Sequence, residues 1–409
     1  MPEIRPFSAI RYRVPDADLG RVLAPPYDVI PAEYQKALYE RDPRNVVRLV
    51  LNRGEGDAGY RDVGETYQRW LAEGVLAADA QPALYLLEQA FELEGRHLER
   101  LGLLARFRAE DPGRGSVLPH EQTRPGPRED RYRVLSATRA NFSPIFLMFP
   151  DAGGRFFRAA AGASAGPPLA AYTDDGGVAH RLWRITDAAA VSELQDLMRG
   201  VRAYIADGHH RYATALRYRD EVGPEGAWTL GYFTPLDDAG LVVLPYHRVL
   251  SEGPGPEEAR RALQAKFGVT DVRGTAAAAR EAARSTSRYA FGLAWPGGAA
   301  LVAESSPEAE RLLPDSTPPS LRALDAYFLH QAVLGEVLRV PAAAVSYVHS
   351  LAEAEAAIET RGCALGVLMR PTPVRQVVDV AEARESMPAK STFFHPKLPS
   401  GLVIHPLLA

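Results

Sequence analysis

Hydrophobic residues recur along this chain at two spacings, one typical of helices and one typical of strands. From Asp57 to Glu73 the apolar and aromatic residues recur at helical intervals, which predicts an amphipathic helix. The run from Ala83 to Leu93 is almost continuously apolar and predicts a strand, and the run from Leu101 to Arg108 predicts a second one. Because Glu94-Gly95-Arg96 between them is typical of a tight turn, we expect the two strands to form a hairpin.

The same patterns extend over the remaining chain. Further helices are predicted over residues 32–41, 188–199 and 321–338, and further strands over residues 141–149, 180–185, 201–206 and 241–249. Polar or flexible composition predicts a loop at 111–130, a Gly/Ala-rich boundary region at 151–176, a peripheral helical region at 253–287 and a loop at 387–402. Since strands and helices alternate irregularly, the predicted fold class is α+β, or mixed α/β, rather than a doubly wound sheet.

Composition restricts the class of protein. The 409 residues suggest two or three domains, and a net charge of −4 argues against nucleic acid as a partner. The single cysteine, Cys363, lies in an apolar strand pattern and is predicted to be a core residue rather than a nucleophile. The chain shows no signal peptide and no apolar stretch long enough for a membrane span, so we expect a cytoplasmic enzyme without a membrane partner.

The most informative polar cluster is Asp207-Gly208-His209-His210-Arg211, which lies between a predicted strand and a predicted helix. Asp207 is predicted to be the N-cap of the helix, and Gly208 would let a ligand approach the backbone. Free amides and the helix dipole favour an anion there, and Arg211 would add a forked contact to a phosphate. His209 and His210 would point about 100° apart around the helix axis, which disfavours a shared metal ion.

Three other segments carry candidate chemistry. Pro25-Pro26-Tyr27-Asp28 presents a carboxylate on a rigid turn, and His120-Glu121-Gln122-Thr123 carries a glutamate that could act as a general base. The Lys390-Ser391-Thr392 loop, with Pro396-Lys397 nearby, suits phosphate oxygens but lacks the glycines of a P-loop. Each segment also has a plain structural interpretation: a turn cap, a solvated loop with ion pairs, and a basic surface loop.

The order of these motifs resembles a known family. IRPF, APPYDVI, HEQT, NFSPIF, ADGHHRYATAL and MPAKSTFFHPKL together are similar to the bacterial and archaeal domain of unknown function 1015 family, from about Ile4 to Leu402. The DGHHR junction alone resembles the ParB/sulfiredoxin-like superfamily and its ADP-dependent free serine kinases. That resemblance implies a ParB-like catalytic core over residues 1–235. Beyond it we expect a C-terminal α/β region over residues 236–409 whose KST loop returns to the site.

The resemblance also implies roles for particular residues. Asp207 to Arg211 would bind the phosphates of ADP or ATP together with Mg²⁺, with Asp207 and Glu121 as the expected metal ligands. Either Asp28 or Glu121 would be the catalytic base, and the resemblance does not choose between them. The KST segment has no counterpart in that resemblance, and the residues themselves suggest that Lys390 would neutralise the transferring charge, that His210 would assist catalysis, and that Ser391 and Thr392 would contact phosphate. Substrate contacts are expected from four further residues: Tyr27, His120, Thr123 and Arg131.

Three functions are therefore open. The first is a nucleotide-dependent phosphotransferase acting on a small hydroxylated metabolite such as serine. The second is a phosphate-ester hydrolase or nucleotidase at the same site, with water in place of the acceptor hydroxyl. The third is a non-enzymatic protein that binds or senses nucleotide.

Overall fold

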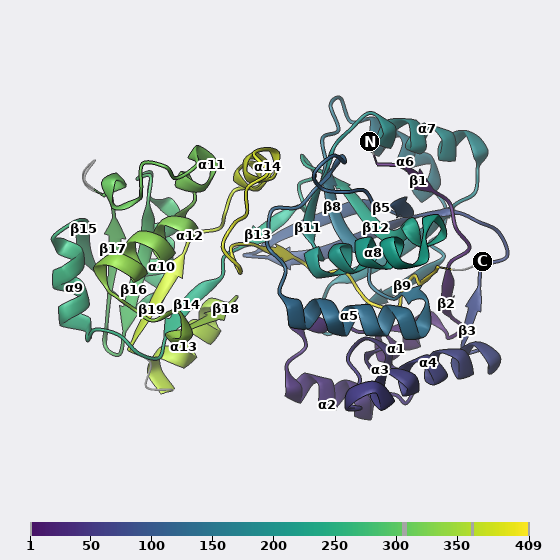
Figure 1. Ribbon diagram of the computed structural model, residues 1–409, viewed down its shortest axis with the longest axis horizontal. Helices are drawn as coiled ribbons and strands as arrows, with labels where there is room; N and C mark the ends of the chain where they lie inside the picture. Colours follow the sequence, from purple (N-terminus) through teal and green to yellow (C-terminus); the bar gives the residue numbers. More distant parts are fainter. Residues whose placement is uncertain (1, 305–308, 361–363, 408–409) are drawn as a thin grey trace. The chain divides into compact units, whose positions relative to one another are not determined.

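A computed structural model describes residues 2–304, 309–360 and 364–407 (Figure 1). Strands and helices are mixed along the chain, which confirms the predicted α+β class. Contacts divide the chain into two units. Unit 1 consists of Met1–Pro119, Thr123–Val242 and Pro396–Ala409, and unit 2 consists of His120–Gln122 and Val243–His395.

Unit 1 is built on one mixed sheet. Its strands follow the order β6-β11-β8-β12-β5-β4-β10-β9, and β1 pairs with β5. Strand β11 is parallel to β6 and antiparallel to β8. The strands of this sheet are β1 (Ile4–Arg5), β4 (Leu84–Leu93), β5 (Arg96–Arg108), β6 (Val117–Leu118), β8 (Ile145–Phe149), β9 (Ala170–Thr173), β10 (Ala179–Ile185), β11 (Ala203–Asp207) and β12 (Trp228–Pro235).

Helices cover one face of this sheet. Apolar residues of α6, α7 and α8 pack with Leu103, Phe107 and Leu147 in one core cluster, in which the Tyr212 ring of α8 stacks on Phe107. The helices of unit 1 are α1 (Asp16–Val22), η1 (Tyr27–Val29), α2 (Ala32–Arg41), α3 (Val47–Val50), α4 (Gly56–Ala72), α5 (Pro125–Thr138), α6 (Arg155–Ser164), α7 (Ala188–Arg199), α8 (His209–Val222) and η2 (Pro224–Ala227).

The chain's C-terminal segment returns to unit 1. Ile404 bridges to Ile10, and β21 (His405–Pro406) pairs with β7 (Ala140–Asn141). A further pair of short strands, β2 (Ile10–Tyr12) and β3 (Leu76–Ala78), lies in the same unit. The return of this segment brings Pro396 and Lys397 into unit 1, although they are far in sequence from its other residues.

Unit 2 has its own antiparallel sheet, in the order β15-β17-β16-β19-β14-β18. Its elements are β14 (His247–Leu250), α9 (Pro256–Gln264), β15 (Gly268–Val272), α10 (Thr275–Arg284), β16 (Ala290–Trp295), β17 (Gly298–Ala303), η3 (Glu310–Leu312), α11 (Pro319–Arg322), α12 (Asp325–Phe328), the π-helix η4 (Leu329–Val337), η5 (Ala342–Ala344), β18 (Val345–Val348), α13 (Leu351–Thr360), β19 (Leu365–Met369) and α14 (Val374–Glu382). Strands β13 (Val242–Leu244) and β20 (Phe393–His395) form a separate pair.

Several predicted elements are confirmed. The helices predicted at 32–41 and 188–199 are α2 and α7, and the helix predicted at 57–73 is α4 within one residue. Asp187 caps α7 by accepting a hydrogen bond from the Ala190 amide at 2.9 Å. The hairpin of β4 and β5 turns at Glu94 and Gly95, both with positive φ, which suits the twist of a two-residue turn.

Some predicted loops and helical regions were wrong. The predicted loop at 111–130 contains β6 and the start of α5, because Pro125 occupies the first helical turn, where proline favours a helix. The predicted boundary region at 151–176 contains α6 and β9. The predicted helix at 321–338 is divided into α11, α12 and η4, and the helical region at 253–287 includes β15.

The predicted strands at 141–149 and 241–249 are both interrupted, by residues 142–144 and by Pro245-Tyr246. The strand predicted at 201–206 is β11, at 203–207, and the loop predicted at 387–402 contains β20. Cys363, predicted to be a core residue, lies outside the described residues.

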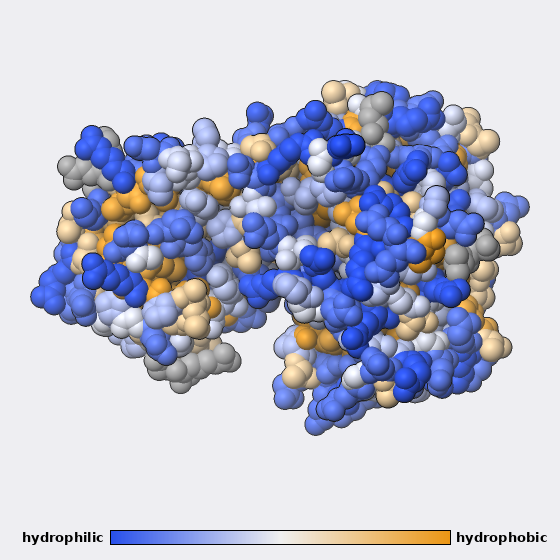
Figure 2. All heavy atoms as spheres, in the orientation of Figure 1, coloured by the Kyte–Doolittle hydropathy of each residue, from blue (hydrophilic) through white to orange (hydrophobic). Residues whose placement is uncertain are grey.

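The visible face of unit 1 is mainly hydrophilic (Figure 2). Among the described residues, one large hydrophobic side chain is exposed to solvent: Val222, with an exposed fraction of 46%. None of the helices described by the structure combines the length and the apolar character required to cross a membrane.

Candidate functional site

The candidate site is built on the junction between β11 and α8. Strand β11 ends at Asp207, and the helix begins at His209. Gly208 between them has φ +96°, a left-handed conformation that favours glycine. Gly208 rather than Asp207 therefore holds the N-cap position, which corrects the predicted N-cap. The Asp207 carboxylate instead accepts the Gly208 amide through Oδ1 at 2.9 Å.

The second oxygen of Asp207 faces two cations. Oδ2 lies 3.4 Å from Lys397 Nζ and 3.4 Å from Arg211 Nη2, and these side chains are 12–19% exposed. Burial alone would raise the pKa of Asp207, but Lys397, Arg211 and His209 hold that pKa well below its usual range. Asp207 is thus a carboxylate at neutral pH, and two positive side chains share its charge.

Buried polar contacts fix Lys397 in this position. The fully buried Arg100 of β5 donates to the Pro396 carbonyl at 2.6 Å and to Gln89 Oε1. Gln89 Nε2 in turn donates to the Lys397 carbonyl at 3.0 Å. These bonds attach the returning C-terminal segment to the sheet, so that Lys397 lies beside the end of β11.

Arg211 folds back over the start of its own helix. Its guanidinium carbon would lie 3.0 Å from a Cβ built on Gly208, so the absence of a side chain at Gly208 gives Arg211 its space. Arg211 also donates to the carbonyl of Pro144, between β7 and β8. The glycine therefore serves two purposes, the turn itself and the position of the guanidinium.

The two histidines differ in their surroundings. His210 Nε2 accepts the backbone amide of Arg124 at 3.0 Å, just before α5 begins. This bond fixes the segment that follows Thr123. Thr123 and that segment both lie in unit 1. His209 is buried, and its charge interaction with Asp207 contributes to the lowered pKa of that carboxyl.

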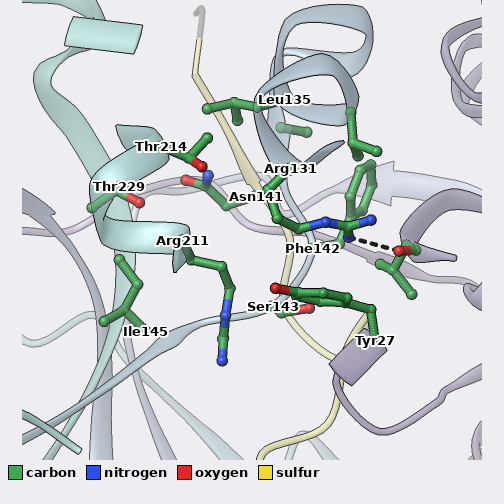
Figure 3. Close-up of a pocket in the computed structure, with 13 residues that line it drawn as sticks. Tyr27, Arg131, Leu135, Asn141, Phe142, Ser143, Ile145, Arg211, Thr214 and Thr229 are labelled. Carbon is green, nitrogen blue, oxygen red and sulfur yellow. Dashed lines mark hydrogen bonds between the residues drawn. The ribbon is translucent and has the colours of Figure 1, made fainter. Parts of the chain in front are cut away.

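Tyr27 and Arg131, both predicted to contact substrate, lie together in unit 1. The Arg131 guanidinium stacks over the Tyr27 ring at 3.9 Å, and Arg131 also donates to the Val50 carbonyl at 2.6 Å (Figure 3). Burial, followed by the charge of Asp28, raises the pKa of Tyr27 to about 12, against the effect of Arg131 and Arg211. The phenol is therefore protonated at neutral pH. Asp28 itself is exposed on the short helix η1.

The remaining predicted residues, apart from Thr123, gather in unit 2. The Lys390 amide donates to Glu121 Oε1 at 3.4 Å, and Lys390 Nζ lies 3.4 Å from the Tyr246 hydroxyl. The buried His120 contacts Thr392 Oγ1 through Nε2 at 3.4 Å. Ser391 donates to the Pro388 carbonyl at 2.6 Å. The HEQ and KST segments, far apart in sequence, are therefore neighbours within unit 2.

Magnesium does not fit Asp207 as this residue is placed. The Asp207 oxygens receive an amide hydrogen and face two cations, which would repel a divalent ion bound to the same carboxylate. Among the described residues, no three His, Cys, Asp or Glu side chains gather in a metal-binding arrangement.

The sequence predicted Lys390 as the lysine that neutralises the transferring charge, and the structure places Lys397 beside Asp207. Both lysines occur in the same C-terminal motif, and only the return of residues 396–407 to unit 1 distinguishes them. The signal that could have found Lys397 is its position after His395-Pro396, where a proline breaks the short strand β20 and redirects the chain.

The fold and this junction define an α+β protein in which cationic side chains gather at the start of a helix. Residues 4–327 match the family described as protein of unknown function (DUF1015), and the chain belongs to this family. No curated protein matches the chain.

Several solved structures resemble parts of the chain weakly. A conserved hypothetical protein from Pyrococcus furiosus has 14% identity and a TM-score of 0.35, over 71% of this chain and 92% of its own. A free serine kinase in complex with AMP has 13% identity and a TM-score of 0.34, over 70% and 88%. SbnI from Staphylococcus aureus, truncated at its C-terminus, has 10% identity and a TM-score of 0.37, over 74% and 87%. Such low TM-scores do not establish a shared fold, so nothing about this chain follows from them.

Proposed function

We propose that the protein is a nucleotide-dependent phosphotransferase that binds nucleotide phosphate at the β11–α8 turn. The observation that carries this proposal is the convergence of Lys397 and Arg211 on Asp207 at the start of α8. Two cations share one carboxylate there, which leaves an excess of positive charge. The first-turn amides of a helix and its dipole favour an anion at the same place.

Each residue of the turn has a distinct task in this proposal. Lys397 and Arg211 bind the phosphate oxygens and stabilise the charge that develops during transfer. Asp207 orients these two cations rather than touching the phosphate, because a carboxylate would repel it. Gly208 allows the phosphate to approach the backbone closely.

The proposed reaction is the transfer of a phosphoryl group from ADP or ATP to a hydroxyl of a small metabolite. The hydroxyl oxygen forms a bond to phosphorus as the bond from phosphorus to the nucleotide oxygen breaks. The hydroxyl proton passes to a carboxylate; Asp28 and Glu121 stay the two candidates predicted from the sequence, and Asp28 lies in unit 1 with the turn. Substrate or phosphate contacts from His120, Thr123, Lys390 and Thr392 stay predictions of the sequence.

The test is product formation by the full chain. The protein is incubated with Mg²⁺, with ADP or ATP, and with a panel of hydroxylated metabolites that includes serine, and phosphorus NMR follows the products. We expect a new phosphomonoester, strongly reduced formation in Lys397→Met, and normal formation in Lys36→Met, a lysine change on the exposed surface of α2. Asp28→Asn and Glu121→Gln are compared to identify the base.

Two results would replace this proposal. Release of inorganic phosphate that does not depend on any acceptor would favour a hydrolase or nucleotidase at the same turn. Calorimetric binding of nucleotide without any product, across the whole panel, would favour a protein that only binds or senses nucleotide.

A further inference from the structure

A pocket in unit 1 adjoins the proposed phosphate turn, and its lining combines apolar side chains with hydrogen-bond donors. Its walls come from η1, α5, the β7–β8 segment, α8 and β12 (Figure 3). Val50, Val134, Leu135 and Ile145 supply apolar surface. In Figure 3 the Arg131 guanidinium lies over the Tyr27 ring, and the Tyr27 hydroxyl points towards the side of the pocket on which Arg211 lies.

Hydrogen-bond donors dominate the polar part of this pocket. Asn141 Oδ1 accepts a hydrogen bond from the Leu230 amide at 3.1 Å, so the NH2 group of Asn141 points away from Leu230. Within the part of the chain that the structure describes, the Asn141 NH2 group and the hydroxyls of Tyr27 and Thr229 meet no protein partner. The raised pKa of Tyr27 keeps its hydroxyl protonated, so it is able to donate.

The charge of the pocket is positive. Arg131 and Arg211 line it, and no Asp or Glu is among the described residues that do so. Arg131 is compensated by Asp130, whose Oδ2 accepts from Arg131 Nε at 2.8 Å. Arg211, in contrast, shares Asp207 with Lys397, so its charge is only partly balanced. A ligand with acceptor oxygens and negative charge therefore fits, whereas an ammonium group finds no carboxylate in the lining.

We propose that this pocket holds the phosphoryl acceptor and selects a small hydroxy acid, a molecule with a carboxylate and a hydroxyl but no ammonium group. The proposal rests on the phosphotransferase function above and defines its substrate class. The carboxylate accepts hydrogen bonds from Tyr27, Thr229 and Asn141. The apolar wall contacts the carbon skeleton.

Arg211 connects the pocket to the turn. One of its Nη atoms faces Asp207 at the start of α8, and Arg211 is also one of the residues that line the pocket. An acceptor bound in the pocket therefore lies beside the phosphate held at the turn. Its free hydroxyl can be directed at phosphorus while its carboxylate stays among the donors, which is the proximity that group transfer requires.

The experiment uses three small molecules of the same length. Glycerate has a carboxylate and two hydroxyls, serine has an ammonium in place of one hydroxyl, and glycerol has no carboxylate. Binding to the full chain is measured by ligand-observed NMR, and ADP binding is measured separately by calorimetry. We expect glycerate to bind at least about tenfold more tightly than serine or glycerol.

Two isosteric variants locate the binding. Tyr27→Phe and Thr229→Val each remove one donor and should weaken glycerate binding about fivefold, which corresponds to one hydrogen bond of about 1 kcal/mol. ADP affinity should not change. Tyr34→Phe, whose hydroxyl contacts the exposed Asp175 on another part of unit 1, is the matched control and should leave both affinities unchanged.

The outcomes separate this proposal from the proposed function. Tight glycerate binding that both variants weaken supports the hydroxy-acid pocket even if no nucleotide binds, in which case only the phosphotransferase function fails. Serine binding as tightly as glycerate overturns the proposal. Loss of ADP affinity in Tyr27→Phe and Thr229→Val also overturns it, because the pocket would then hold the nucleoside.

Discussion

Replacing Asp207 by asparagine tests the role of the carboxylate that two cations share. The asparagine side chain would keep the shape of the aspartate and would still accept the Gly208 amide through an oxygen. It would remove the negative charge 3.4 Å from both Lys397 Nζ and Arg211 Nη2. We expect the Asp207→Asn variant to be less stable and to bind phosphate and ADP more tightly than the wild type.

The size of the stability loss follows from these distances. Two unit charges 3.4 Å apart attract each other by about 5 kcal/mol at an effective dielectric constant of about 20, before desolvation is counted. Removing one partner of a buried ion pair typically costs about 3–5 kcal/mol. Because Asp207 is 19% exposed, we expect the lower end, about 3 kcal/mol at neutral pH. Because the pKa of Asp207 is lowered in the folded state, this stabilisation is fully present at pH values above the pKa of a free carboxyl. It is lost as the pH falls towards the pKa of Asp207 in the folded state.

Urea unfolding with and without phosphate measures both effects. Phosphate should restore part of the lost stability in Asp207→Asn, since an anion replaces the missing charge, and calorimetry should show ADP binding about tenfold more tightly. Asp57→Asn is the matched control, because the Asp57 side chain is 80% exposed and pairs with Arg133 at the surface. A variant as stable as the wild type, or one that binds ADP more weakly, would refute the role given to Asp207.

Three further predictions concern other parts of the protein. Gly208→Ala should lower the free energy of unfolding by about 1–3 kcal/mol and abolish ADP binding, because φ is +96° at this position and the new Cβ would press on Arg211. Urea unfolding measures the first effect and calorimetry the second. His210→Ala should cost about 1 kcal/mol and speed hydrogen exchange of the Arg124 amide, measured by NMR, whereas unchanged exchange would contradict the bond described. Burial lowers the pKa of His247 to about 4, so the folded state binds fewer protons than the unfolded state between about pH 6.5 and 4. Unfolding monitored across this range should therefore show stability falling as the pH is lowered, and the His247→Gln variant should show a smaller fall.

Local patterns predicted the elements of this fold better than their connections. The α2, α7 and β4–β5 hairpin predictions hold because helical spacing, an Asp cap and a Glu-Gly turn act within a few residues. The α5 helix was missed because its sequence is mostly polar and Arg-rich, and its prolines were interpreted as signs of a loop. Propensity alone does not reveal a helix that is stabilised mainly by its neighbours.

The candidate site was only partly predictable for the same reason. The DGHHR motif marked the junction, and the pairing of Tyr27 with Arg131 shows that two residues singled out from the sequence lie together. The position of Lys397 depends on Gln89 and the buried Arg100, which lie far from it in sequence. No spacing rule connects residues so far apart, so the lysine beside Asp207 could be identified only from the fold.

The central claim is that the β11–α8 turn binds nucleotide phosphate through Lys397. The most direct measurement is a calorimetric titration of ADP into the wild type, Lys397→Met, Lys390→Met and Lys36→Met at one fixed salt concentration. We expect Lys397→Met to bind ADP at least about tenfold more weakly, through the loss of one charged contact, and Lys36→Met to match the wild type. Equal ADP affinity in Lys397→Met and the wild type would contradict it.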